Sequence, residues 1–180
     1  GLPQAEPARA EIFVRRAFLD LIGLPPSASE LAHWSEQLEN GPKASLDDGA
    51  VARMIDALLA RPQYGERWAR HWLDVARYSE IGGWTQDGRS NPMGFHYRDW
   101  VIRAFNEDMP FSAFIRHQIA GDHLDSEAAV GTGFLALGPN YTSDGGDPES
   151  IAQAKGETLD DRVDTFSRGL LGLTVSCSRC

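Results

Sequence analysis

Apolar residues recur at every third or fourth position along most of this chain, and that spacing predicts amphipathic helices. The first predicted helix runs from about Glu6 to Ile22, and Gly23 and the pair Pro25-Pro26 end it. Its apolar stripe is formed by Phe13, Val14, Ala17, Phe18 and Leu21. We therefore expect one side of this helix to be buried and the other side, which carries paired charges, to face water.

Gly and Pro residues divide the rest of the chain into further helical segments. These segments cover residues 27–38, 47–60, 65–81, 97–107, 111–121, 127–137 and 159–175. The first of them begins with Ser27 and Glu30 at the spacing of a capping box, in which each side chain bonds the backbone N–H of the other residue. Residues 82–94 contain four glycines and predict an ordered, turn-rich loop.

The last predicted helix, at about 159–175, begins with acidic residues and ends next to the cysteines. Asp160, Asp161 and Asp164 are expected in its first turn, where the partial positive charge of a helix N-terminus favours carboxylates. The preceding stretch at 140–156 is polar and acidic and is predicted to be a mobile loop.

No segment of strand length alternates clearly between apolar and polar residues, so no β-sheet is predicted. A chain of 180 residues is long enough to bury one substantial core. We therefore predict an all-α fold, namely a single globular domain over residues 1–180, with seven or eight short helices that pack non-coaxially.

The helix predicted at 65–81 is the most aromatic part of the chain. Trp68, His71 and Trp72 share one face at steps of three and four residues. These two tryptophans and Trp100 are expected to be largely buried against the apolar stripe of the first helix. His71 then faces inward, either as a buried histidine held by hydrogen bonds or as a group that contacts a cofactor.

The charge of the chain limits the classes of partner. It has 17 Lys and Arg against 26 Asp and Glu, which gives a formal net charge of −9. Nucleic-acid binding and docking on anionic lipid both depend on Lys and Arg, so neither partner is expected. No apolar run approaches the roughly 20 residues that span a bilayer, so no membrane span is predicted.

Both cysteines lie in the last four residues, as Cys177-Ser178-Arg179-Cys180. Thiols at this spacing suit a redox disulfide, half of a zinc site, a local disulfide, or the attachment of a c-type haem. A thioredoxin-like centre needs a βαβ setting, a zinc site needs two further ligands, and a haem site needs a His directly after the second Cys. The spacing alone leaves these uses open.

A second candidate site is the loop and helix start between residues 82 and 96. Its polar and aromatic residues are Trp84, Asp87, Arg89, Asn91 and His96. An aromatic ring beside carboxylate, guanidinium and amide groups suits a sugar ring or another polar ligand. The alternative is a structured connector that binds nothing.

Four motifs, in this order along the chain, resemble those of one protein family. They are RRAFLDLIGLPP at residues 15–26, YGERWARHWLDVARY at 64–78, YRDWVIRAFN at 97–106 and QIAGD at 118–122. The chain resembles the second family of planctomycete-type cytochrome c-like domains, a domain of unknown function, over nearly its whole length. In that family a segment similar to residues 169–175 leads into a CxxCH motif, and Cys177 and Cys180 match its two cysteines.

The resemblance implies haem c joined by thioether bonds to Cys177 and Cys180, with the proximal His directly after Cys180. It also implies that the chain is the N-terminal portion of a longer bacterial protein in the periplasm or at the cell surface. His71 is the first candidate for a second group at the haem, as a ligand or a neighbour. Reserve candidates are His117 and His123, and the candidate thioether ligands are Met54, Met93 and Met109.

Three functions follow as hypotheses. The first is a haem-associated redox or electron-transfer domain, whose partners are a redox protein or the remainder of its own chain. The second is a haem-free helical module that binds a glycan or a protein partner through the loop described above. The third is a haem or metal enzyme that acts on sugars derived from polysaccharides.

Overall fold

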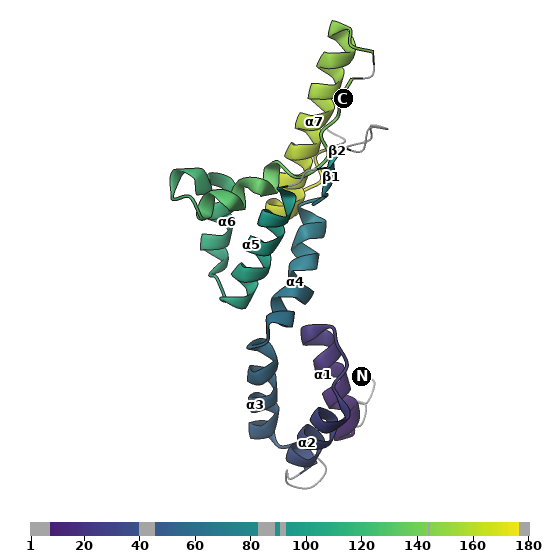
Figure 1. Ribbon diagram of the computed structural model, residues 1–180, viewed down its shortest axis with the longest axis vertical. Coiled ribbons are helices and arrows are strands. Elements are labelled where there is room, and N and C mark those ends of the chain that lie inside the picture. Colours follow the sequence, from purple (N-terminus) through teal and green to yellow (C-terminus); the bar gives the residue numbers. More distant parts are fainter. Residues whose placement is uncertain (1–7, 40–45, 83–88, 91–92, 144, 177–180) are drawn as a thin grey trace, which may run out of the picture. The chain divides into compact units, whose positions relative to one another are not determined.

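The computed structural model describes residues 8–39, 46–82, 89–90, 93–143 and 145–176. Over these residues the chain forms seven α-helices, three short 3-10 or π-helical segments, and one pair of two-residue strands (Figure 1). The prediction of an all-α fold is confirmed. The helices gather into two compact units, Gly1–Trp68 and Ala69–Cys180.

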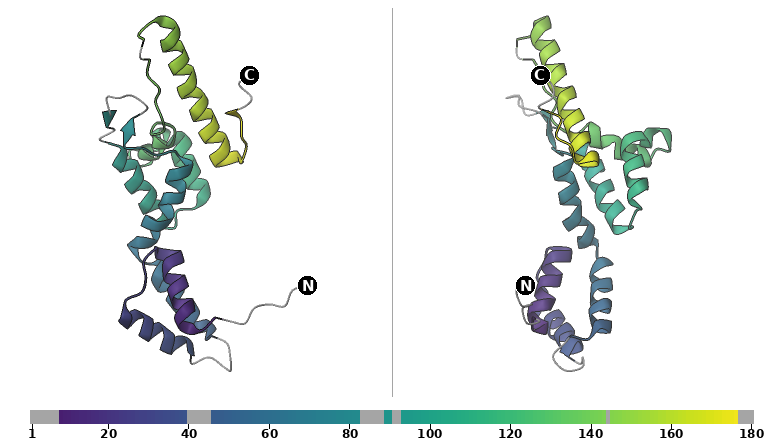
Figure 2. Two further views of the ribbon diagram at one scale, coloured as in Figure 1. Left: turned by 90° about the vertical axis from the view of Figure 1, so that its right-hand side faces the viewer. Right: turned by 180° about the vertical axis from the view of Figure 1, so that it is seen from behind.

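The first unit is built from three helices and the start of a fourth. They are α1 (Ala10–Ile22), α2 (Ala28–Glu39), α3 (Asp48–Leu59) and the first half of α4 (Pro62–Val75). The first three helices pack against one another in pairs (Figure 2). Their buried core consists of Ala10, Val14, Phe18, Ile22, Leu38, Ala50, Met54 and Leu58. The predicted apolar stripe of the first helix therefore packs against α2 and α3.

The capping box predicted at the start of α2 is confirmed. The backbone N–H of Ser27 donates to Oε2 of Glu30 at 2.8 Å, and the backbone N–H of Glu30 donates to Oγ of Ser27 at 3.3 Å. Glu30 also accepts a hydrogen bond from Nη2 of Arg61 at 2.6 Å. The hydrogen bonds from the Ser27 side chain and backbone, with the Arg61 guanidinium, lower the pKa of Glu30 from 4.5 to about 2.

Replacing Glu30 by alanine is expected to lower the free energy of unfolding by about 1 kcal/mol at pH 7, because the helix cap is lost. A carboxyl whose pKa falls on folding stabilises above its unfolded pKa. The difference between wild type and variant should therefore shrink as the pH falls from about 4.5 towards 2. Denaturant unfolding at several pH values measures it. Glu39→Ala, which removes an exposed carboxylate at the end of the same helix, is the control, and an equal effect of both changes would contradict the prediction.

The second unit contains the remaining elements. These are the second half of α4, β1 (Ile81–Gly82), β2 (Arg89–Ser90), α5 (Gly94–Asn106), α6 (Phe111–Ala120), η1 (Gly121–His123), η2 (Ala128–Leu135), α7 (Pro148–Phe166) and the π-helical turn η3 (Ser167–Leu171). The strands pair antiparallel within the predicted loop. Most of the core comes from α4, α5, α6 and η2, through Ala69, Ala76, Tyr97, Trp100, Val101, Ala104, Phe114 and Phe134.

A hydrogen-bonded polar group lies inside this apolar core. The indole N–H of Trp72 donates to Oε1 of Gln118 at 2.9 Å and to the Tyr97 hydroxyl at 3.0 Å. The Tyr97 hydroxyl donates to the same Gln118 oxygen at 2.7 Å, and burial raises the pKa of Tyr97. Because an indole N–H can only donate, the Gln118 side chain must turn its oxygen towards it. The three side chains thus tie α4, α5 and α6 together.

Two predictions about the tryptophans are wrong. Trp68 is 36% exposed. Trp72 and Trp100 do pack in a core, but it is the core of the second unit, whereas the stripe of α1 packs in the first. The periodicity correctly identified an apolar face on each helix, but it carries no information about which faces meet.

The predicted end of the fourth helix and the predicted start of the last helix are also wrong. The fourth helix ends at Val75 rather than near Ile81, because the chain turns at Arg77. The last helix begins at Pro148 rather than near Leu159, inside the stretch predicted to be a loop. Asp147 caps it by accepting the N–H groups of Glu149 and Ser150, and Pro148 suits the first helical position. The Asp147 cap and Pro148 therefore start the helix here, although the first part of α7 contains few apolar residues.

Candidate functional site

The segment that leads into the two cysteines is fixed to α7. After η3, Gly172 takes the left-handed conformation with a φ of 65°, and the N–H of Leu173 donates to the carbonyl oxygen of Ser167 at 3.1 Å. The chain then returns to α7, where the N–H of Ser176 donates to Oδ1 of Asp164 at 3.2 Å. Cys177 and Cys180 themselves lie outside the described residues. The contact at Ser176 therefore fixes the chain one residue before the motif.

Asp164 is the central group of this arrangement and is only 3% exposed. Its Oδ2 accepts from Nη2 of Arg77 at 2.6 Å and from Nε of Arg168 at 2.6 Å. Burial raises the pKa of this carboxyl, but the hydrogen bonds from Arg77 and from the Ser176 N–H, with Arg168, outweigh burial and hold the pKa below its usual range. Asp164 is thus an ionised acceptor at neutral pH.

Arg77 reaches this carboxylate from the end of α4. Its φ is 53°, in the left-handed region that glycine usually occupies at this place. The N–H groups of Arg77 and Tyr78 donate back to the carbonyl oxygens of Asp74 and Leu73, at 3.2 and 2.9 Å, which is the Schellman pattern. An ordinary residue is strained here by roughly 1 kcal/mol. The arginine offsets this cost through ion pairs with Asp161 and Asp164.

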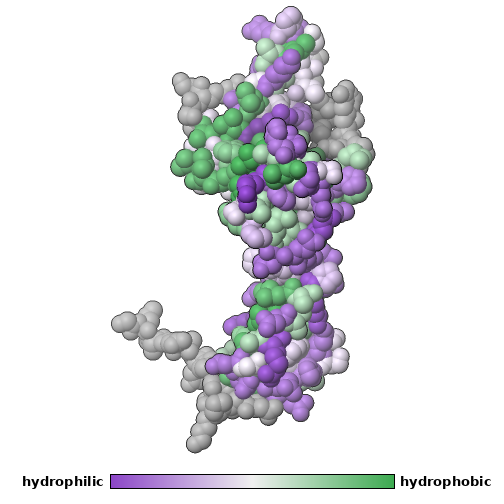
Figure 3. Space-filling view, turned by 90° about the vertical axis from the view of Figure 1, so that its left-hand side faces the viewer, coloured by the Kyte–Doolittle hydropathy of each residue, from purple (hydrophilic) through white to green (hydrophobic). Residues whose placement is uncertain are grey.

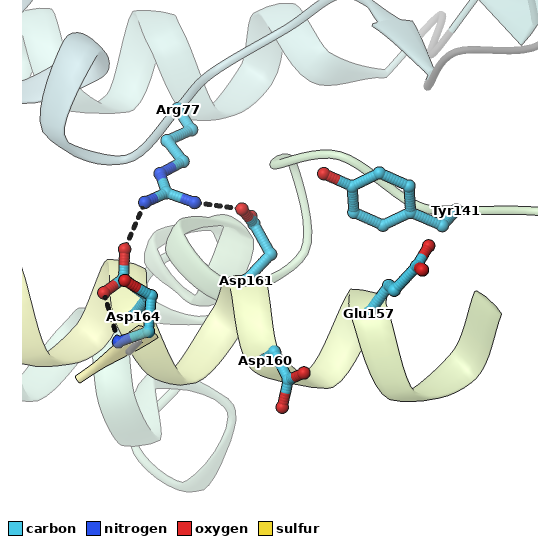
Figure 4. A pocket seen from close by; sticks show the side chains of 7 residues that line it. Arg77, Tyr141, Glu157, Asp160, Asp161 and Asp164 are labelled. Atoms are coloured by element: carbon cyan, nitrogen blue, oxygen red, sulfur yellow. Dashed lines mark hydrogen bonds and ion pairs between the residues drawn. The ribbon is translucent and has the colours of Figure 1, made fainter. Parts of the chain in front are cut away.

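These residues line a pocket of about 280 Å³ in the second unit (Figure 4). Its lining residues are Arg77, Tyr141, Glu157, Asp160, Asp161, Asp164 and Ser176. Asp161 and Asp164 point towards Arg77, whereas Asp160 points away from it (Figure 4). One ring, one guanidinium and four carboxylates give the pocket a polar wall with a negative balance. It therefore suits a polar ligand better than an anion.

Contacts between α7 and the chain before it hold Tyr141 at this pocket. The N–H of Tyr141 donates to Oγ1 of Thr158 at 3.0 Å, and Arg162 donates to Oδ1 of Asn140 at 2.8 Å. Further along, the hydroxyl groups of Ser143 and Ser150 are 2.5 Å apart. The segment before α7 therefore lies along this helix.

A second pocket, of about 200 Å³, lies between α5, α6 and the start of η2. Its lining includes Trp100, Met109 and His117, and an ion pair of 3.0 Å joins Arg103 to Glu127 on its wall. The His117 ring lies 6.0 Å from that of Trp100. Its Nδ1 is buried and has no hydrogen-bond partner among the described residues. The two pockets share no lining residue.

His71 is exposed on α4, so the prediction that it faces inward is wrong. The buried face of this part of the helix uses Ala69, Leu73 and Ala76, at steps of four and three. His71 lies on the opposite side of the helical wheel from these three residues, so it faces outward. Its role as a group that contacts a cofactor stays a prediction.

The other predicted site residues are scattered. His96 is exposed on α5, with its ring 4.0 Å from that of Phe95, and Arg89 belongs to β2. Trp84, Asp87 and Asn91 lie outside the described residues. Among the reserve candidates, Met54 fills the core of the first unit, Met93 and His123 are exposed, and Met109 is half-buried. Of the histidine and methionine candidates, His117 and Met109 line a common pocket.

Reading the sequence missed Arg77 and Tyr141 and misassigned the acidic residues near them. Asp160, Asp161 and Asp164 lie in the second half of α7 rather than in its first turn, so two of them are balanced by arginines and not by a helix N-terminus. The sequence held one signal for Arg77. It stands two residues after the end of α4, where a helix end commonly has glycine. A residue that ends a helix without glycine often has a side-chain contact that holds it.

Within the ranges that the structure describes, no three His, Cys, Asp or Glu side chains are grouped to hold a metal ion. Nor does any helix in those ranges combine the length and the apolar character needed to cross a membrane.

Comparison with known proteins identifies the family. Searches of curated proteins and of solved structures gave no significant match. The sequence pattern of one family, described as "PSCyt2: Protein of unknown function (DUF1549)", matches residues 1–180. That range includes every motif quoted above and the residues around Asp164. The chain therefore belongs to the PSCyt2 family, a planctomycete-type family of unknown function.

Proposed function

We propose that this chain is a haem-associated (c-type) redox or electron-transfer domain of an exported bacterial protein. The observation that carries the proposal is the CxxC motif directly after Ser176, whose backbone is bonded to the buried Asp164. A haem joined by two thioethers needs two thiols presented together at one edge of the ring system. Export follows from the proposal, because haem c is attached outside the cytoplasm.

The residues before the motif fit a flat apolar group. Leu171 and Leu173 are 59% and 55% exposed, and Leu159 and Val163, one turn apart on α7, are also exposed. Figure 3 shows exposed apolar residues among the hydrophilic surface of the second unit. A porphyrin bound at Cys177 and Cys180 would give such leucines an apolar partner. The half-exposed Arg168 is a candidate partner for a propionate carboxylate.

In this proposal the two thiols hold the cofactor, and the haem supplies a one-electron couple when bound. The exposed leucines shield part of it from water. Glu157, Asp160 and Asp161 line the pocket that Ser176 also lines, so their charge favours the more positive, oxidised state. The pocket would thus act on the potential rather than on a chemical step.

The natural protein, produced in a host that attaches haem c outside the cytoplasm, is expected to carry one covalent haem at Cys177 and Cys180. A pyridine haemochrome spectrum and intact mass measure it. Cys177→Ser with Cys180→Ser should lose the haem completely, whereas Ser178→Ala, inside the same motif, should keep it. Two free thiols or a plain disulfide, with no haem mass, would refute the proposal.

The pocket at Tyr141 favours a second candidate function, a haem-free module that binds a polar ligand such as a glycan. An aromatic ring with carboxylates and a guanidinium around a pocket of about 280 Å³ is suited to sugar hydroxyls. The visible spectrum separates the two functions, since only the first gives a Soret band. Calorimetric titration with oligosaccharides tests the second, and Tyr141→Ala should abolish any heat of binding.

A further inference from the structure

We infer that Asp164 is a positioning residue for the two thiols: its carboxylate holds the backbone of Ser176 and so fixes where the CxxC motif begins. The inference deepens the proposed function and rests on it, because the thiols are the groups that would react with the cofactor. The contact itself can be measured without any haem.

The two carboxylate oxygens of Asp164 accept hydrogen bonds from different donors. Oδ2 receives both guanidinium groups, from Arg77 and Arg168, each at 2.6 Å. Oδ1 accepts a hydrogen bond from the Ser176 N–H at 3.2 Å. The arginines hold the carboxylate ionised and fixed, which leaves its other oxygen aimed at the backbone. An N–H donor to an ionised acceptor makes a stronger hydrogen bond than one to a neutral group.

Apolar burial does little to place this segment. Leu173, Thr174 and Ser176 are all exposed, so packing gives these three residues little stabilisation. The turn at Gly172 reverses the chain, and the bond from Ser176 to Asp164 is the described contact nearest the motif. A hydrogen bond at Ser176 restrains the backbone one residue before the motif, which favours a reaction that needs two thiols presented together.

The arrangement joins the motif to a distant part of the chain. Asp164 bonds Arg77, which follows α4 and is held in a left-handed conformation that an ordinary residue adopts only at a cost in stability. A surface ion pair alone would not require this backbone. Arg77 therefore holds the Asp164 carboxylate in place, and that carboxylate in turn holds the backbone of Ser176.

Amide hydrogen exchange of the full 180-residue chain, reduced and free of haem, tests the inference. In wild type the Ser176 N–H should exchange at least about tenfold more slowly than its intrinsic rate, the protection expected from one charge-assisted hydrogen bond. Asp164→Ala should remove that protection and change the ratio of iodoacetamide alkylation rates of Cys177 and Cys180 by at least about threefold. Asp161→Asn, which removes another Arg77 partner but no bond to Ser176, should leave both values within about twofold.

Asp164→Asn keeps the volume of the side chain and serves if the alanine variant does not fold. Its single oxygen cannot serve both the arginines and Ser176, so faster exchange at Ser176 is again expected. An unprotected Ser176 amide in wild type would overturn the inference without any variant. So would unchanged exchange and alkylation ratios in a folded Asp164 variant. Neither result depends on haem attachment, so failure here is distinct from failure of the proposed function.

Discussion

Trp72→Ala is expected to lower the free energy of unfolding of the second unit by about 3–5 kcal/mol. The indole stacks on Phe134 with ring centroids 5.5 Å apart and meets Phe114 edge-on at 5.0 Å. Its N–H also donates to Gln118 and Tyr97. Truncation therefore leaves a cavity and removes a donor from two buried acceptors, and both effects destabilise.

Denaturant unfolding followed by near-ultraviolet circular dichroism measures this loss. Trp68→Ala is the matched control, since it removes the same side chain one turn earlier on α4, where the indole is 36% exposed. The control is expected to cost about 1 kcal/mol or less. A loss below about 1 kcal/mol for Trp72→Ala, or equal losses for both variants, would show that α4 does not bury this face.

Gly121→Ala is expected to destabilise the second unit by about 3 kcal/mol, near the upper end for overpacking. A Cβ at this glycine would lie 2.5 Å from the carbonyl carbon of Ala128 and closer still to its oxygen. The obstacle is backbone, so it cannot move aside as a flexible side chain would. Gly131, on η2, likewise faces the backbone of His117, at 2.9 Å from its oxygen. The two glycines let η2 approach α6 and η1 closely.

Thermal and denaturant unfolding of the variant measure the effect. Gly49→Ala, at the start of α3, is the control, because the atoms near its new Cβ are the ends of the Asp47 and Arg53 side chains, at 3.3 and 3.4 Å. This control is expected to change stability by about 0.5 kcal/mol or less. A Gly121→Ala variant as stable as wild type would mean that η1 and η2 are further apart than described.

Local patterns predicted most of the secondary structure. Helical spacing identified five of the seven α-helices in the described residues to within a few residues, the exceptions being α4 and α7, and the Ser27–Glu30 spacing identified a real capping box. The exceptions have physical reasons. A helix start with few apolar residues, as at Asp147-Pro148, depends on capping rather than on an apolar stripe. The end of α4 depends on Arg77, whose unusual backbone conformation is held by carboxylates 84 and 87 residues away.

Part of the candidate site could likewise be predicted from the sequence, and part of it could not. The CxxC motif and its family resemblance could be read from the sequence, because they depend on residue identity and spacing alone. The contacts of Asp164 could not, because Arg77, Arg168 and Ser176 converge on it only once α4, α7 and the turn at Gly172 are in place. His71 shows the converse, since residue type and neighbours favoured a buried site but the helix turned it outward.

The sequence by itself determined that this protein is all-α, that its helices are amphipathic, and that its two thiols form one motif. These properties follow from periodicity and from residues close together in the chain. Only the tertiary structure decided that Trp72 and Trp100 belong to a different core from the stripe of α1, and that a buried carboxylate holds the approach to the cysteines. Such pairings join residues far apart in sequence, and their energy arises only when packing removes water from the groups that meet.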